Sequence, residues 1–146
     1  MTTIACNRVK MASDSKVSLA HKGFSYPAIK IMKGPNIVVG AAGDGGDCSR
    51  FLKWALGGFK GAEPKWKDTT TEDMVVGLVL RPEGISIWSI GDPEPELVQG
   101  DFFAIGSGGK AARAAIMRGA TPEEAVEIAF QVDDLNTGPP LQVLEL

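Results

Sequence analysis

The amino-acid sequence predicts an α+β layered domain, and three observations lead to this class. Strand-like segments occur in pairs joined by tight turns, which is typical of antiparallel hairpins. The helical segments are grouped between these hairpins and do not alternate with single strands, as they would in a parallel α/β fold. The chain has 146 residues, 44% hydrophobic and 23% charged, which suits a globular domain with a sizeable core. We therefore expect a single domain over residues 1–146.

The first hairpin is expected at the N-terminus. Residues 2–7 are mostly β-branched or small and predict a strand. A tight connection follows, and residues 11–18 predict the returning strand. Asp14 lies among small residues of that strand, as a turn or edge residue would. Residues 21–27 predict a loop, which ends the hairpin.

Two further strands are expected next. Alternation along residues 28–32 places Ile29 and Ile31 on one face and Lys30 on the other. Strand geometry alone leaves open whether Lys30 faces solvent or a site. After a turn, residues 37–42 form a continuous apolar run, which predicts a strand in the centre of a sheet.

A glycine-rich turn at residues 43–47 follows this run and leads into a helix. Glycines permit close backbone approach and leave N–H groups free for an anion or a polarised carbonyl. Asp47 is expected to cap the helix predicted over residues 48–56, where apolar residues recur at helical spacing. The turn lacks the Gly-Lys-Ser/Thr ending and the G-x-G-x-x-G spacing of nucleotide-binding loops, which argues against a nucleotide site.

The second half of the chain predicts a loop, two helices and more strands. Residues 59–72 are rich in Gly, Pro, Lys and Thr and predict a loop, in which Trp66 covers the core or a neighbour. One helix is expected over residues 111–118, ending at Gly119. Another is expected over residues 121–131, which begin with a threonine cap, a proline and two acids. The remaining strands are expected at residues 73–80, 85–90, 97–98, 102–105 and 141–146.

Composition and charge exclude several function classes. The net charge is −3 and the basic residues are scattered, which argues against nucleic-acid and membrane partners. There is no signal peptide or membrane-spanning run, and Cys6 and Cys48 form no CxxC site. Reduced core thiols in a cytoplasmic protein are therefore expected. His21, the only histidine, is expected to be an ordinary loop residue, so we expect no metal site and no cofactor.

The N-terminus carries a candidate nucleophile. Initiator methionine is usually removed when the next residue is small, and removal of Met1 would leave Thr2 with a free α-amine beside its hydroxyl. An α-amine has an ordinary pKa of about 7.7–8.0, so much of it is neutral at physiological pH and accepts the hydroxyl proton. One residue would then supply nucleophile and base, as in threonine variants of the Ser-His-Asp arrangement. Taken alone, these residues favour the simpler interpretation, which is a common N-terminus followed by a strand.

Six short stretches, in order, carry a family resemblance. They are residues 2–4, 12–15, 29–31, 41–44, 103–109 and 134–138. Together they resemble the proteasome β-subunit family of N-terminal nucleophile hydrolases, and are most similar to HslV and to short proteasome-subunit-like proteins of phage. The resemblance covers most of the chain. It implies a four-layer αββα sandwich and threonine-type peptidase activity on extended polypeptide.

The resemblance also implies roles for the matching residues around the nucleophile. Thr2 would attack a peptide carbonyl, and its α-amine would take the proton directly or through water. Lys30 matches the lysine whose charge acts on that amine, and Asp14 matches the carboxylate that pairs with it. The N–H of Gly43 matches the donor to the oxyanion.

The same resemblance implies a supporting network and a substrate strand. Ser107 matches the serine that hydrogen-bonds the α-amine. Asp134 and Thr137 match the Asp-x-x-Ser/Thr-Gly pair that holds this network, with Asp133 as an adjacent competitor that spacing disfavours. Ser18 and the strand around it would line the extended substrate by strand addition.

The chain departs from the family pattern in its helices and its ending. One helix, where the family has two, is expected between the Gly43 turn and the next hairpin. One helical layer is therefore reduced, which argues against the standard double ring, whereas some homo-oligomer is still expected. Prolines at residues 139–140 replace the usual glycine-rich ending. No propeptide is seen beyond Met1, so an aminopeptidase would suffice for activation.

Partners and alternatives follow from the same comparison. By analogy with the family, an ATP-dependent unfoldase is a possible partner, although no residue of the sequence indicates one. One alternative is a catalytically inactive assembly or peptide-binding subunit, whose signature would be a retained Met1. Another is a non-peptidase amidase with the same nucleophile, for which a small closed pocket is expected.

Overall fold

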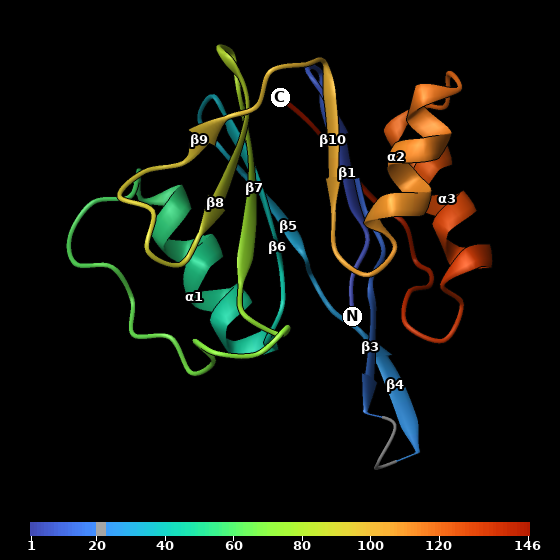
Figure 1. Cartoon of the computed structure of the whole chain (residues 1–146), viewed down its shortest axis with the longest axis horizontal. Coiled ribbons are helices and arrows are strands. Elements are labelled where there is room, and N and C mark those ends of the chain that lie inside the picture. The colour runs from blue at the N-terminus through green and yellow to red at the C-terminus, as the bar shows by residue number, and fades with distance from the viewer. Residues whose placement is uncertain (20–22) are drawn as a thin grey trace.

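The computed structural model describes residues 1–19 and 23–146 and shows four layers, in the order helix, sheet, sheet, helices (Figure 1). The outer helices are α1 (Gly45–Leu56) on one side and α2 (Gly109–Met117) and α3 (Pro122–Val132) on the other. One sheet has the order β5 (Ile31–Gly34), β6 (Ile37–Ala42), β7 (Val76–Arg81), β8 (Gly84–Ser89), β9 (Glu96–Leu97). The other has the order β10 (Phe102–Ile105), β1 (Ile4–Asn7), β2 (Lys10–Ser13), β11 (Gln142–Glu145).

All neighbouring strands in these sheets run antiparallel. A separate hairpin of β3 (Lys16–Leu19) and β4 (Phe24–Pro27) projects below the sheets in Figure 1. The predicted α+β class and its αββα layers are thus confirmed. One helix lies on one side of the paired sheets and two lie on the other (Figure 1).

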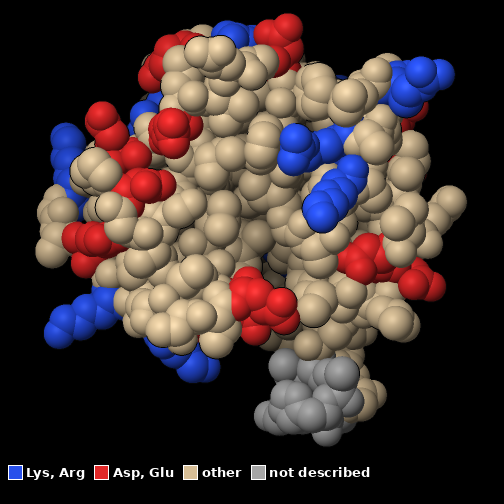
Figure 2. Space-filling model, in the orientation of Figure 1, with Lys and Arg blue, Asp and Glu red and all other residues tan. Residues whose placement is uncertain are grey.

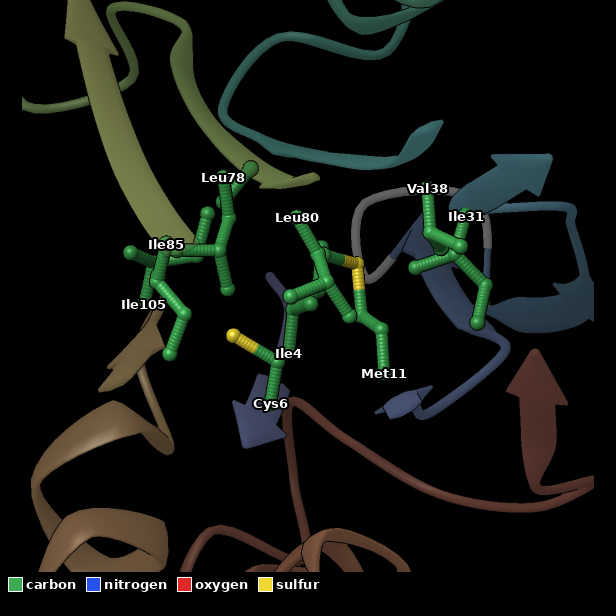
Figure 3. Packing of buried hydrophobic residues seen from close by; sticks show 10 residues of the cluster. Ile4, Cys6, Met11, Ile31, Val38, Leu78, Leu80, Ile85 and Ile105 are labelled. Atoms are coloured by element: carbon green, nitrogen blue, oxygen red, sulfur yellow. The ribbon is translucent and has the colours of Figure 1, made fainter. Parts of the chain in front are cut away.

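The central core lies between the two sheets. There Ile4 and Met11 of one sheet meet Leu78 and Leu80 of the other (Figure 3). Each sheet also has one outer core on its other face. One lies between α1 and its sheet, and the second lies between α2 and α3 and the other sheet. Because each sheet has a core on both faces, β6 is buried at every position, as its continuous apolar sequence predicts.

The loop of residues 59–72 lies in the same layer as α1. Trp66 of this loop packs on Trp88 of β8, with ring centroids 5.3 Å apart, so it covers the core. The carboxylate of Asp47 holds the loop, because it accepts the backbone N–H groups of Lys67 and Asp68 at 2.9–3.1 Å. The prediction of one reduced helical layer is confirmed. In place of a second helix, this layer has a loop that packs through Trp66 and is held by the buried carboxylate of Asp47.

The predicted cap of α1 is wrong. Asp44 occupies the cap position and accepts the N–H of Asp47 at 3.1 Å. The helix starts at Gly45, earlier than predicted, because its first two residues are glycines, which carry no apolar signal. Asp47 is consequently inside the first turn, where its negative charge is favourable. By contrast, α3 is capped by Thr121 as predicted, with a reciprocal hydrogen-bonded capping box between Thr121 and Glu124.

Three strand predictions also need correction. Residues 24–27 form β4 and pair with β3, although a loop was predicted there. The predicted strand over residues 11–18 is interrupted between β2 and β3. Ile29 and Ile31 do not share a face, since they are 73% and 2% exposed. The predicted alternation of side chains does not apply to Ile29, because β5 begins only at Ile31 and Ile29 lies before the strand.

The remaining sequence expectations concern single residues. Cys6 is buried and Cys48 half-buried, and both are free thiols. The expected loop position of His21 lies outside the described residues. Within residues 1–19 and 23–146, none of the helices has the length and apolar character to cross a membrane.

Candidate active site

A buried lysine–carboxylate pair lies beneath the N-terminus. Asp14 directly follows β2 and Lys30 directly precedes β5, so both residues stand where a strand ends or begins. The Nζ of Lys30 lies 3.0 Å from each carboxylate oxygen of Asp14. The two side chains are 7% and 0% exposed, so solvent screens the pair little. The structure therefore resolves the question of where Lys30 points: it faces inward.

Backbone donors complete the surroundings of Asp14. Its carboxylate accepts the N–H groups of Thr3 at 2.9 Å, Lys16 at 3.0 Å and Gly138 at 3.3 Å. A buried charge is tolerated only when it is paired and hydrogen-bonded, and here both oxygens have several donors. Asp14 thus joins the N-terminal strand, the start of β3 and the C-terminal loop at one point.

Lys30 also contacts the peptide group that joins Met1 to Thr2. Its Nζ donates to the carbonyl oxygens of Met1 and Lys16, both at 2.7 Å. Burial lowers the pKa of Lys30, and the attraction of Asp14 opposes this shift. Burial and the charge of Lys30 in turn lower the pKa of the α-amine at Met1, against the pull of nearby carboxylates. An amine in this environment loses its proton more readily than a free one.

Thr2 lines a cleft between the ends of the two sheets. The residue is only 5% exposed, and the cavity beside it has a volume of about 500 Å³. One wall is formed by the end of β6, Gly43 and residues 72–74. The other wall is formed by the end of β10, Ser107 and the start of α2. Figure 2 shows a hollow near the middle of this face, and Thr2 is one of the residues that line the cleft.

Gly43 presents its backbone to this cleft. Its φ of 126° lies in a region that favours glycine. A Cβ at this position would lie 2.8 Å from the carbonyl oxygens of Asp73 and Met74. No hydrogen-bond acceptor for the Gly43 N–H is found within residues 1–19 and 23–146. This N–H is therefore able to donate to an oxygen bound in the cleft.

The turn before α2 approaches the backbone of Thr2 closely. The Oγ of Ser107 lies 3.4 Å from the Thr2 carbonyl oxygen, and the N–H of Gly108 donates to the same oxygen at 3.3 Å. Gly106 has a φ of 94°, and a Cβ there would collide with the Thr2 carbonyl. Glycines on both sides of Ser107 thus allow the turn to reach the N-terminal strand.

Asp133, and not Asp134, makes the contact with Ser107. The Ser107 Oγ donates to a carboxylate oxygen of Asp133 at 2.6 Å, and the amide of Asn136 donates to the other oxygen at 2.6 Å. Asp134 is exposed, and its backbone carbonyl accepts from Lys16 at 2.9 Å. The preference for Asp134 over Asp133 is wrong for this contact, because Asp133 is the residue that ends α3 and faces the turn.

Two other predicted residues lie apart from Thr2. Thr137 is buried, and its hydroxyl donates to the carbonyls of Asp133 at 3.2 Å and Ala129 at 3.4 Å. It therefore fastens the C-terminal loop to α3. Ser18 lies on β3, where its hydroxyl contacts the Leu135 carbonyl at 3.4 Å, and it is not among the residues that line the cleft.

Four charged residues in the cleft lining were not predicted. Glu72 and Asp73 belong to one wall, and Lys110 and Arg113 to the other. Lys110 and Arg113 are three residues apart, which places them on one face of a helix. Once the helix was predicted, this spacing could have indicated that the two residues act together. The two acids lie in a loop that has no periodicity. Within the described ranges, no group of His, Cys, Asp and Glu side chains is arranged to hold a metal ion.

Comparisons with known proteins identify the fold. No protein-family model matches the chain, and no curated protein matches it significantly. HslV from Trypanosoma brucei is 22% identical, with a TM-score of 0.68 and 99% of each chain covered. BPH from Thiobacillus denitrificans, solved in complex with epoxomicin, is 19% identical with a TM-score of 0.65, covering 99% of this chain and 97% of BPH.

A third neighbour was solved as an assembly. Anbu from Pseudomonas aeruginosa, described as a helical assembly, is 15% identical with a TM-score of 0.63, covering 99% of this chain and 80% of Anbu. At such identities the likeness concerns the fold. The chain therefore shares its fold with HslV and BPH over 99% of its length.

Proposed function

We propose that this protein is a threonine-type peptidase of the proteasome β-subunit type, in which removal of Met1 exposes Thr2 as the nucleophile. The observation that carries this proposal is the position of Lys30. Its ammonium contacts both oxygens of Asp14 and the carbonyl of Met1, which belongs to the peptide group ending at the Thr2 nitrogen. The fold shared with HslV and BPH supports the same function.

The acylation step uses groups of the cleft. The Thr2 Oγ1 attacks the carbonyl carbon of a substrate peptide bond and gives its proton to the Thr2 α-amine. Burial and the charge of Lys30 lower the pKa of the α-amine at Met1, and the same surroundings would favour a neutral Thr2 amine, which acts as the base. The oxygen that becomes negative accepts the N–H of Gly43, and one such donor typically contributes about 2.7–4 kcal/mol to transition-state stabilisation.

The remaining steps return the enzyme to its starting state. The protonated amine gives its proton to the leaving nitrogen, the C–N bond breaks, and the acyl group stays on Thr2 as an ester. Water then attacks the carbonyl carbon of this ester and gives a proton to the amine. The bond between Thr2 Oγ1 and the acyl carbon breaks, the amine returns the proton to Oγ1, and the carboxylic acid product leaves. Ser107, held by Asp133, lies beside the Thr2 backbone and would orient the amine or that water.

The proposal extends to substrate and assembly. We propose polypeptide substrates, handled by a domain spanning residues 1–146 that assembles with copies of itself. The helical assembly of Anbu, which shares the fold, supports the homo-oligomer. With one helix in the α1 layer, contacts made through that layer would differ from those of a two-helix subunit. An ATP-dependent unfoldase would be required only if the substrates are folded proteins.

The test is intact mass of the protein before and after incubation with epoxomicin, a peptide epoxyketone. This reagent forms its ring adduct only with a threonine hydroxyl and a free α-amine together. We expect loss of Met1 and the addition of one epoxomicin per chain. The Thr2→Ala variant is the control, because it keeps a small residue after Met1 and lacks the hydroxyl.

Two outcomes would count against the proposal. Retention of Met1 in the purified protein would remove the proposed base and favour an inactive assembly or peptide-binding subunit. Loss of Met1 without an adduct would show that Thr2 does not react as an N-terminal nucleophile. An adduct of equal yield on Thr2→Ala would place the reaction elsewhere in the chain.

A further inference from the structure

The two walls of the Thr2 cleft carry opposite charges. Glu72 and Asp73 lie on the wall formed by the loop before β7, and Lys110 and Arg113 lie on the wall formed by α2. All four are exposed, and none of them forms a salt bridge within the described part of the chain. Figure 2 shows acidic side chains at the lower edge of the hollow and basic side chains to its upper right.

The basic wall is the better organised of the two. Lys110 and Arg113 are three residues apart on α2, so both project from one face of the helix. The guanidinium of Arg113 lies 4.7 Å from the ring centroid of Phe103, which restrains it beside the cleft by a cation–π contact. The first turn of α2 contains no acidic residue, so its positive end is not neutralised locally.

The acidic wall is formed by a loop that precedes β7. Glu72 and Asp73 belong to a loop and have no contact comparable to the one between Arg113 and Phe103. The charges that the fold holds in place beside the cleft are therefore those of Lys110 and Arg113.

We propose that Lys110 and Arg113 form a subsite for a carboxylate of the peptide substrate. The carboxylate comes either from an aspartate or glutamate side chain or from the C-terminus of a short peptide. This inference rests on the proposed peptidase function and names the class of substrate that the same cleft prefers. Arg113 and Lys110 bind and select the substrate and take no part in the transfer of protons at Thr2.

The test measures binding, so it does not depend on turnover. Full-length Thr2→Ala protein is titrated into fluorescein-labelled hexapeptides that are neutral apart from one position, occupied by Glu, Gln or Lys. Each peptide is made with a C-terminal acid and with a C-terminal amide. We expect the carboxylate-bearing peptides to bind about threefold to tenfold more tightly than their neutral partners at low salt, since each partly screened charge contact contributes modestly. Comparison of Glu with Gln, and of acid with amide, tells which carboxylate is used.

Matched variants locate the effect. Arg113→Gln is expected to remove most of the preference, and Arg113→Lys to keep part of it because the charge remains. Arg118→Gln removes the same charge from the end of α2, outside the cleft lining, and is expected to leave the preference unchanged. The subsite would be overturned if all peptides bound equally, if the Lys peptides bound more tightly than the others, or if no peptide bound. It would also be overturned if Arg118→Gln reduced the carboxylate preference as much as Arg113→Gln does.

The two proposals fail in distinguishable ways. An epoxomicin adduct without a carboxylate preference would leave the peptidase function standing and remove the subsite. A carboxylate preference that Arg113→Gln abolishes, in a chain that forms no adduct, would leave a peptide-binding cleft and remove the catalytic role of Thr2.

Discussion

The Lys30 ammonium lies 3.0 Å from both carboxylate oxygens of Asp14, in a pair that is almost completely buried. The same ammonium contacts the carbonyl of Met1, so one charge pair supports both the folding of the N-terminal strand and the environment of the Thr2 nitrogen. A buried pair of this kind is costly to leave half complete, because desolvation of the remaining charge is no longer offset.

The first prediction concerns the stability of this pair. Lys30→Met is expected to lower the free energy of unfolding by about 3–5 kcal/mol, because Asp14 remains buried without its cation. Lys30→Met with Asp14→Leu is expected to lose less than the sum of the two single variants. Urea unfolding of the four proteins measures this coupling. Arg8→Gln, in the exposed Arg8–Asp101 pair, is the control and should cost less than about 1 kcal/mol.

The second prediction separates the two neighbouring aspartates. Asp133→Asn is expected to lower kcat/KM for a peptide substrate by about tenfold to 100-fold, because Ser107 loses its charged acceptor. Asp134→Asn should leave kcat/KM within about twofold, since its carboxylate is exposed and its backbone contact with Lys16 persists. Steady-state kinetics of both variants decide the matter. A larger loss for Asp134→Asn would restore the assignment that spacing favours.

The third prediction compares two glycines at the start of the α1 turn. Gly43→Ala is expected to destabilise the protein by about 1–3 kcal/mol, because φ is 126° and the new Cβ would press on backbone oxygens at 2.8 Å. Gly45→Ala places a Cβ in open space at the first helical position and should be neutral or stabilising by up to about 1 kcal/mol. Thermal unfolding of the two variants checks the difference, and similar losses at both positions would argue against strain at Gly43.

The fourth prediction is a dependence of stability on pH. Burial alone would raise the pKa of Asp47, but hydrogen bonds from Lys67, Asp68 and Arg50 outweigh it and hold the pKa below its ordinary value. The unfolded chain therefore binds a proton at Asp47 before the folded chain does, and stability rises with pH in that range. Its contribution is complete above the ordinary carboxyl pKa of about 3.9 and is lost as pH falls below it.

The measurement is urea unfolding between neutral and acid pH. Asp47→Asn should lower the free energy of unfolding at neutral pH and flatten its decrease toward acid, because no group remains to be protonated there. Glu83→Gln, in the exposed β7–β8 turn, is the matched control and should leave the slope unchanged. An unchanged slope in Asp47→Asn would show that another carboxylate governs the acid transition.

Local periodicity was sufficient for the elements that are decided by their own residues. The apolar run of β6, the amphipathic pattern of α1 and the threonine cap of α3 each lie within about a dozen residues, and the structure has all three. Prediction failed where pairing depends on another segment. Residues 24–27 carry no clear strand pattern, and they form β4 because β3 offers them a partner edge.

The site shows the same division. The sequence by itself determined the four-layer fold class and the residue types near the N-terminus, since these follow from hydrophobic pattern and from matching motifs. Only the tertiary structure decided that Lys30 points inward and that Asp133 contacts Ser107. It also placed Lys110 and Arg113 opposite two acids. The physical reason is that contacts such as Gly138 N–H to Asp14 join residues 124 positions apart, and side-chain direction at such distances is set by packing of the sheets.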